Sequence, residues 1–316
     1  DGKIDAVEGL RVTFQGDDGR VTHAVDSVDL SVANGATLGL VGESGCGKSV
    51  TSLAIMGLLP KQSAAVTGAI RFDGFDLLDV PDATLRDLRG NRLAMIFQEP
   101  MTSLNPVLTI GEQIAESLRR HEAVTRKQAL ERTIEMLKLV QIPNAAGRVH
   151  HYPHQFSGGM RQRVMIAMAL ACQPDVLIAD EPTTALDVTV QAEIIELMRN
   201  LCAERGTAIL MISHDLGLVA NVCRRVGVMY AGRIVEERRS DDIFRAGAHP
   251  YTQGLVDSLP RLGSRAALGR ARLREIAGVV PAIADFTAGC RFNPRCALAT
   301  EICRTTVPET TDRKST

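Results

Sequence analysis

The chain has 316 residues, of which 45% are hydrophobic and 23% charged, a composition typical of a soluble globular protein of about two domains. Its 36 basic and 37 acidic residues leave a formal net charge of -1, which argues against a nucleic-acid-binding surface. The most apolar stretch is broken by Gln173, Pro174 and Asp175, so it falls short of the roughly 20 apolar residues of a membrane-spanning helix. The sequence begins DGKIDAVEGL, without an initiator Met or a secretory signal region, and we expect a trimmed N-terminus.

Short apolar runs rich in Val, Ile and Leu alternate with longer helical patterns, which predicts an α/β fold with a mixed or parallel sheet. The helical pattern from Ile110 to Gln141 predicts a helical subdomain inserted into the core at about residues 108–172. The composition changes after about Pro260, so we expect one domain over residues 1–260 and a small cysteine-rich extension over residues 261–316. The candidate buried strands are TLGLVG from Thr37, RLAMIF from Arg92, DVLIAD from Asp175 and TAILMIS from Thr207.

The segment GESGCGKS, from Gly42 to Ser49, fits G-x-x-x-x-G-K-[ST] and lies between a predicted strand and a predicted helix. The glycines of such a loop let backbone N–H groups point at phosphate oxygens, and the helix adds its positive end. Lys48 would reach the β- and γ-phosphates, and Ser49 would ligate Mg²⁺. A glycine-rich turn without function is the alternative, and the flanking strand and helix argue against it. The expected nucleotide-contacting residues of this P-loop are Gly42, Ser44, Gly45, Cys46, Gly47, Lys48, Ser49 and Val50.

Two adjacent carboxylates, Asp180 and Glu181, follow the apolar strand DVLIAD, at the strand end where ligands bind in open α/β sheets. Their adjacency suggests that the two carboxylates have different roles. Asp180 would hold Mg²⁺, directly or through water, and Glu181 would polarise the attacking water as general base. The alternative is a strand that ends in a solvated acidic turn.

A second anion site is predicted at FSGGMRQRVMIAMAL, where Ser157, Gly158 and Gly159 precede a long amphipathic helix. A Ser-Gly-Gly helix start offers unpaired backbone donors and a positive dipole end. One ATP does not need two phosphate cradles in one chain. We therefore expect the second cradle to face the γ-phosphate of an ATP held by another, similar chain.

The order GESGCGKS, Gln98 in IFQEP, FSGGM, VLIADEP, ALD at Ala185 to Asp187, and His214 in MISHD resembles that of the ATP-binding cassette (ABC) ATPases. The resemblance implies a P-loop α/β core with an antiparallel β subdomain and an inserted helical subdomain. It also implies that Gln98 links Mg²⁺ and water to a transmembrane partner, that Asp187 lies at a dimer interface and that His214 is a switch histidine near the γ-phosphate. Phe14 is the candidate for the aromatic residue that stacks on adenine.

Longer stretches, among them YPHQFSGGMRQRVMIAMAL and HPYTQGLVDSLP, are similar to the oligopeptide/dipeptide permease ATPases of bacterial importers. This similarity implies an ATPase at the cytoplasmic face of the cell membrane that drives peptide uptake. Its implied partners are two transmembrane permease subunits, a second homologous cassette in a heterodimer and an extracytoplasmic solute-binding protein, with no nucleic acid.

Other functions stay open. The same family includes importers of nickel, glutathione and other small solutes. A soluble ABC ATPase acting on nucleic acid or ribosomes would call for tandem cassettes or basic arms, which the sequence lacks. An unrelated P-loop kinase or GTPase is disfavoured by the SGG segment and by His214.

Cys290, Cys296 and Cys303 lie in GCRFNPRCALATEIC, a segment with few core-forming residues. Structural disulfides are not expected at the cytoplasmic face, where thiols stay reduced. The C-x₅-C-x₆-C spacing differs from the paired C-x₂-C of common zinc fingers and suits an iron–sulfur cluster. The family resemblance implies a 4Fe-4S cluster with a further cysteine downstream, which this chain lacks up to Thr316. Zinc and free thiols are the alternatives, and Cys172, Cys202 and Cys223 are expected to be buried small hydrophobes.

Overall fold

The computed structural model describes residues 4–16, 19–98, 103–184, 186–259, 276–286, 288–309 and 311. Its larger sheet has six strands in the order β10-β9-β3-β8-β7-β6. Neighbouring strands from β9 to β6 pair in parallel, and β10 runs antiparallel to β9. The carboxyl ends of the parallel strands therefore meet at one edge. The strands are β3 (Thr37–Val41), β6 (Leu93–Ile96), β7 (Val176–Asp180), β8 (Ala208–Ser213), β9 (Arg225–Tyr230) and β10 (Arg233–Arg239).

The parallel strands are continuous apolar runs, and every position of β7 and β8 is buried. A parallel sheet covered on both faces requires such runs because neither face meets water. The four strands predicted from the sequence are β3, β6, β7 and β8, and their observed bounds agree with the prediction to within one residue.

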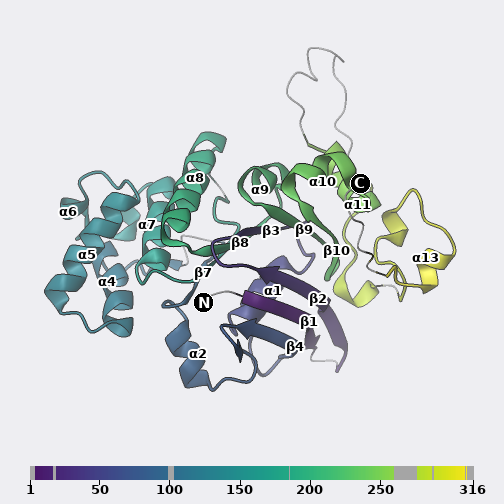
Figure 1. Ribbon diagram of the computed structural model, residues 1–316, viewed down its shortest axis with the longest axis horizontal. Coiled ribbons are helices and arrows are strands. Elements are labelled where there is room, and N and C mark those ends of the chain that lie inside the picture. The colour runs from purple at the N-terminus through teal and green to yellow at the C-terminus, as the bar shows by residue number, and fades with distance from the viewer. Residues whose placement is uncertain are drawn as a thin grey trace, which may run out of the picture.

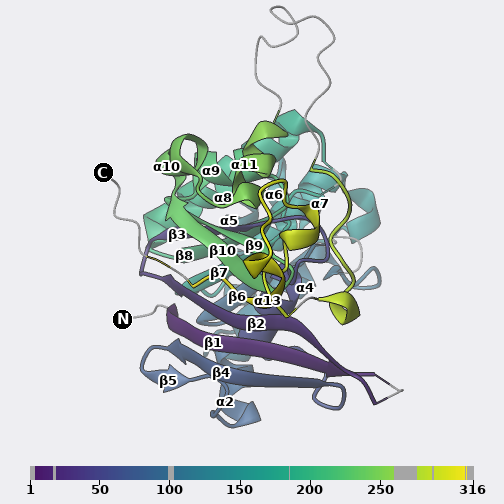
Figure 2. The same ribbon diagram turned by 90° about the vertical axis from the view of Figure 1, so that its right-hand side faces the viewer.

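A smaller antiparallel sheet has the order β2-β1-β4-β5 and lies beneath the larger sheet in Figure 2. Its strands are β1 (Ile4–Gln15), β2 (Val21–Val32), β4 (Ala64–Phe72) and β5 (Phe75–Asp76), and helix α2 (Asp82–Leu88) follows. Helix α1 (Lys48–Ile55) contacts β1, β2 and β7, so it lies between the two sheets. Leu10, Ile55 and Leu210 belong to one buried cluster that joins the sheets through this helix.

A group of helices lies at one side of the molecule in Figure 1. It consists of α4 (Ile110–His121), α5 (Arg126–Leu139), α6 (Ala145–Arg148), the short 3₁₀ helix η1 (Pro153–Gln155) and α7 (Gly158–Leu170). Thr109 caps α4 through the Glu112 N–H, and Thr125 and Gln128 form a capping box at the start of α5. Helix α7 contacts α4, α5 and β6, and it therefore connects this group to the sheet.

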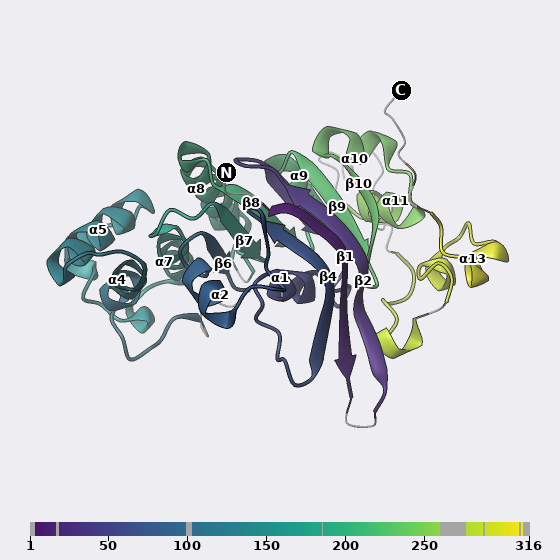
Figure 3. The same cartoon turned by 60° about the horizontal axis from the view of Figure 1, so that its bottom comes forward.

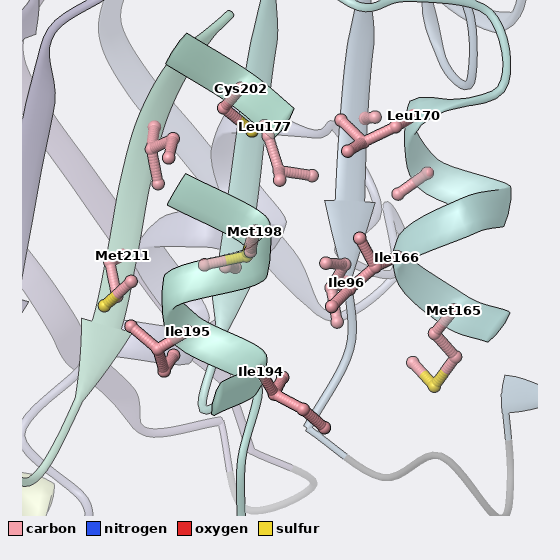
Figure 4. Packing of buried hydrophobic residues seen from close by; sticks show 14 of the residues in the cluster. Ile96, Met165, Ile166, Leu170, Leu177, Ile194, Ile195, Met198, Cys202 and Met211 are labelled. Carbon is pink, nitrogen blue, oxygen red and sulfur yellow. The ribbon is translucent and has the colours of Figure 1, made fainter. Parts of the chain in front are cut away.

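Helices α8 (Val188–Arg205) and α9 (Leu216–Val222) cover the larger sheet together with α7. Figure 4 shows Ile166 of α7 and Met198 of α8 among the side chains that gather over Ile96 and Met211 of the sheet. Burial of these apolar side chains is the main stabilising contribution at this face. Within the described residues, every helix is too short or too polar to cross a bilayer.

The C-terminal region lies at the side of the sheet away from the helical group (Figures 1 and 3). It contains α10 (Ser240–Ala246), α11 (Pro250–Asp257), the 3₁₀ helices η2 (Ile283–Asp285) and η3 (Asn293–Arg295), and α13 (Ile302–Thr305). Phe292 is buried, and its ring centroid lies 5.1 Å from that of Tyr230 and 5.4 Å from that of Tyr251. The domain boundaries stay predictions, because residues 260–275 lie outside the described residues.

Candidate functional site

The predicted P-loop joins the end of β3 to the start of α1, at the carboxyl edge of the larger sheet. Gly47, the residue before α1, has φ 104°, a left-handed conformation that favours glycine. A Cβ at this position would lie 2.8 Å from the carbonyl oxygen of Ala24, so a side chain is excluded on two grounds. The loop therefore has the tight turn into a helix that phosphate binding requires.

Lys48 is buried, with 4% of its surface exposed. Its Nζ donates hydrogen bonds to the carbonyl oxygens of Gly42, at 2.8 Å, and Glu43, at 3.0 Å. The ammonium group is thus held inside the loop. Cys46 is fully buried beside it, and burial raises the pKa of this thiol against the opposing effect of Lys48. Cys46 consequently acts as a small packing residue within the loop.

Asp180 ends β7 and is buried, and its oxygens accept hydrogen bonds from two residues of α1. The Ser49 hydroxyl lies 3.2 Å from Oδ1, and the Ser52 hydroxyl lies 3.4 Å from Oδ2. Burial is the main cause that raises the pKa of Asp180, and the charge of Glu181 adds to it. A hydroxyl and a carboxylate on facing elements are oxygen ligands that suit Mg²⁺.

Glu181 has φ 46°, an uncommon conformation for a residue with a side chain, and it stands next to Asp180 at the sheet edge. Its Oε2 accepts hydrogen bonds from Gln98 Nε2, at 3.3 Å, and from the Thr184 hydroxyl, at 3.0 Å. Its Oε1 lies 3.3 Å from Nδ1 of His214. Two predicted site residues from two other loops, Gln98 and His214, therefore converge on the carboxylate of Glu181.

The second predicted cradle lies at the start of α7. The Ser157 side chain accepts a hydrogen bond from the Met160 N–H, at 3.3 Å, and so caps the helix. Gly158 and Gly159 form the first turn, and a Cβ on Gly159 would lie 2.9 Å from Cγ1 of Val190 in α8. In the part of the chain that the structure describes, no hydrogen bond or ion pair connects Ser157, Gly158 or Gly159 to the P-loop. The two cradles are separate within one chain.

The positions of Asp187 and Phe14 are defined in the structure, but their predicted roles depend on groups that it does not contain. Asp187 caps α8, since its Oδ1 accepts a hydrogen bond from the Val190 N–H at 3.0 Å. Phe14 is half-buried near the end of β1, opposite Thr22 of β2 and Ala64 of β4. The dimer-interface role of Asp187 and the adenine contact of Phe14 stay predictions.

The tail cysteines do not support the predicted iron–sulfur cluster. Among the described residues, no three His, Cys, Asp or Glu side chains are gathered so as to hold a metal ion. Cys290, Cys296 and Cys303 form no disulfide bond, and the Cys303 sulfur lies 3.4 Å from the Thr300 hydroxyl. The residues as placed do not fit a 4Fe-4S group.

The prediction of a cluster drew on the scarcity of core-forming residues in this segment, and a small segment with little apolar surface usually needs other bonds to stay ordered. In the structure, other contacts hold the tail to the cassette. Phe292 is buried, and the guanidinium groups of Arg291 and Arg295 bind Asp26 and Glu43.

The other cysteines behave largely as expected. Cys202 and Cys223 are buried, and burial raises the pKa of each thiol to about 12. Cys172 is only half-buried and lies in the turn after α7.

Sequence reasoning missed two residues that contact the P-loop from the C-terminal region. The Tyr251 hydroxyl accepts a hydrogen bond from the Glu43 N–H at 2.8 Å. Arg295 donates to both carboxylate oxygens of Glu43, at 2.6 and 3.0 Å. These partners stand 208 and 252 positions apart from Glu43, so no local spacing could reveal the contacts.

Comparisons with known proteins agree with this geometry. A family model described as ABC transporter matches residues 25–184, and one described as the C-terminal region of oligopeptide/dipeptide transporters matches residues 235–303. The chain is 52% identical over 303 residues to a probable peptide ABC transporter ATP-binding protein of Sinorhizobium fredii, covering 96% of this chain and 89% of that protein. It is 49% identical over 302 residues to an oligopeptide transport ATP-binding protein of Salmonella typhimurium, covering 96% and 88%. Among solved structures, a dimeric post-hydrolysis ATP-binding cassette bound to ADP and Pi has a TM-score of 0.66 at 26% identity, covering 74% of this chain and 98% of that chain.

Proposed function

The chain belongs to the ABC transporter family as one of its ATP-hydrolysing subunits, and we propose that it powers the uptake of dipeptides and oligopeptides through a separate permease. The observation that carries the ATPase assignment is the convergence of Gln98, Glu181 and His214 beside the P-loop and Asp180. The relatives named for peptide transport cover 96% of the chain, which supports the peptide assignment.

The residues at the sheet edge fit MgATP. Gly47 and the start of α1 leave backbone donors for the phosphates, and the Lys48 ammonium lies within the same loop. Ser49 and Asp180 are the oxygen donors that would hold Mg²⁺, which neutralises phosphate charge when it is bound. We propose that Phe14 contributes the apolar contact to adenine.

Glu181 is the proposed general base. Its carboxylate would take the proton of the attacking water, while Gln98 holds one carboxylate oxygen through a hydrogen bond and the His214 ring lies against the other oxygen. The left-handed backbone of Glu181 supports a functional constraint, since such strain persists only where the surroundings impose it.

We propose that a second, homologous cassette completes the site. Ser157 and Gly158 are exposed, and a partner's γ-phosphate would bind at this helix start, with Asp187 near the contact between the cassettes. The dimeric state of the solved cassette supports this arrangement by similarity. A heterodimer with a different cassette is the specific form that we propose.

The permease would dock on a groove of 830 Å³ between the segment that follows α1, strand β6 and the helical group. Phe97 lines this groove and is 40% exposed, so a partner seated there would lie next to Gln98, the residue that contacts the Glu181 carboxylate. The groove is lined by three arginines, Arg89, Arg119 and Arg120, and by one glutamate, Glu116. This excess of positive charge favours a cytoplasmic permease helix that carries acidic residues. In this arrangement the chain sits at the cytoplasmic face of the membrane and meets a solute-binding protein only indirectly.

The test is copurification of the chain from membranes, followed by identification of the associated chains and reconstitution in vesicles. We expect two permease subunits, a second cassette and ATP-dependent uptake of labelled dipeptides. If the vesicles take up nickel or glutathione but no peptide, the peptide assignment is wrong and the ATPase role stands. Failure of the chain to copurify with any membrane partner would contradict the importer function.

A further inference from the structure

Glu43 is the acidic residue of the P-loop segment GESGCGKS, and a carboxylate beside bound phosphates is electrostatically unfavourable. The charge is compensated by the C-terminal region and not by the loop itself. Both carboxylate oxygens of Glu43 bind Arg295, at 2.6 and 3.0 Å, in the two-pronged geometry that is strongest for this pair. The Arg295 side chain is 5% exposed and that of Glu43 is 31% exposed, so water reaches this ion pair from the Glu43 side only.

Arg295 is fixed in place by contacts other than Glu43. Its guanidinium donates hydrogen bonds to the carbonyl oxygens of Ile276, Ala277 and Gly278, and it lies 5.8 Å from the ring centroid of Tyr230. A guanidinium that is held from several sides presents its charge to Glu43 at a fixed position.

The backbone of Glu43 is held by the same region. Its N–H donates to the hydroxyl of Tyr251, a fully buried residue of α11. Tyr251 follows the cap of that helix, where Nδ1 of His249 accepts a hydrogen bond from the Tyr251 N–H at 3.1 Å. The side chain and the backbone of one loop residue are thus positioned by two separate elements of the C-terminal region.

We propose that Arg295 is a positioning residue for ATP, which neutralises Glu43 and so allows the P-loop to accept a polyanion. The C-terminal region therefore sets the ATP affinity of this chain by docking against the loop. This inference rests on the proposed ATPase function, which supplies the nucleotide.

Arg291 provides a matched control. It lies four residues before Arg295 in the same docked segment and is similarly buried, at 9% exposure. It donates to the carbonyl oxygen of Ala231 and to Oδ2 of Asp26, at 2.7 Å. Asp26 also binds Arg233 at 2.6 Å, so the carboxylate of Asp26 keeps an ion-pair partner when Arg291 is replaced.

The experiment measures displacement of a fluorescent ATP analogue by MgATP from the purified full chain. We expect Arg295→Met to weaken ATP binding about tenfold and Arg291→Met less than about twofold, although both lower the melting temperature. In assembled complexes, Arg295→Met should raise KM for ATP and leave kcat nearly unchanged. The effect of Arg295→Met should shrink at high salt, because salt screens charge repulsion.

Rescue separates the charge effect from loosening of the tail. Adding Glu43→Gln to Arg295→Met should recover most of the ATP affinity, since no carboxylate is then left uncompensated, and Arg295→Lys should retain affinity within about threefold. Equal losses for Arg295→Met and Arg291→Met, or no recovery with Glu43→Gln, would overturn the inference. If Arg295→Met does not fold, Arg295→Lys takes its place in the test. The inference is then overturned if folded Arg295→Lys binds ATP more weakly than wild type and the addition of Glu43→Gln does not restore the binding. A wild-type chain that binds no ATP would instead refute the proposed function.

Discussion

Two helix starts in this molecule carry glycines and offer backbone donors to an anion, yet their surroundings differ. The P-loop before α1 is enclosed: Lys48 is buried, and Glu43 is held by Tyr251 and Arg295. The start of α7 is open, with Ser157 and Gly158 exposed. The first cradle is enclosed within one chain, whereas the second is open to the partner cassette that we propose.

The two helix starts also differ in their caps. No side chain caps α1 at Gly47, so its first N–H groups remain for a ligand. Ser157 caps α7 through the Met160 N–H. The enclosed start therefore leaves more backbone donors for phosphates than the open start, for which we propose a contact across an interface.

The largest effect should come from the catalytic carboxylate beside the enclosed cradle. Glu181→Gln keeps the shape of the side chain but removes its ability to accept a proton, so turnover should fall about a thousandfold while ATP binding persists. ATPase rates and ATP-dependent dimer trapping on a sizing column measure both parts. Turnover within about tenfold of wild type would refute the assignment of the base.

Gly158→Asp tests the open cradle directly. A Cβ at Gly158 would meet Cδ2 of Leu186 at 3.4 Å, an ordinary contact, so the substitution fits. Its carboxylate should repel a partner's γ-phosphate and slow hydrolysis at the opposite site about a hundredfold. Nucleotide binding at Lys48 of the same chain should remain, and binding assays with the single chain check this. Loss of binding there would contradict the separation of the two cradles.

A pair of alanine substitutions compares the packing of the two starts. Gly47→Ala should lower the free energy of unfolding by about 2 kcal/mol, because its φ of 104° and the Ala24 carbonyl both oppose a side chain. Gly158→Ala should change it by less than about 0.5 kcal/mol, as expected at an open helix start. Urea denaturation of both variants measures the free energy of unfolding. Equal losses would show that the two helix starts do not differ in packing.

A smaller effect than that of Gly47→Ala concerns Asp180, whose pKa is raised by burial above its unfolded value of 3.8. A carboxyl group with a raised pKa destabilises the fold once the pH exceeds 3.8, and this cost is absent below that pH. Asp180→Asn should therefore stabilise the nucleotide-free chain at pH 7 by about 1 kcal/mol, and the gain should vanish toward pH 4. Thermal unfolding at several pH values tests the direction, and a gain that grows on acidification would contradict it.

The sequence predicted the parts of the site that depend on local pattern. The runs that became β3 and β7 place Lys48 and Asp180 at one sheet edge, because parallel strands that lead into helices deliver their carboxyl ends to the same side. The local pattern was misleading for Cys290, Cys296 and Cys303. Their spacing suggested metal bonds, whereas the tail is held by arginine and aromatic contacts to distant elements.

The contacts of Glu43 with Tyr251 and Arg295 could not be predicted, since each depends on how the C-terminal region docks. The same holds for the convergence on Glu181, where the family resemblance supplied Gln98 and His214 but pattern alone did not. Long-range docking depends on the packing of whole elements, and a single sequence contains little local information about it.

The resting position of Lys48 has a calorimetric consequence. Its ammonium already donates to the carbonyl oxygens of Gly42 and Glu43, so the arrival of ATP exchanges hydrogen-bond partners and does not create all of them anew. The heat released on association should then be modest for the affinity attained. Because the loop is formed in advance, the heat-capacity change should also be small compared with that of a segment that folds around its ligand.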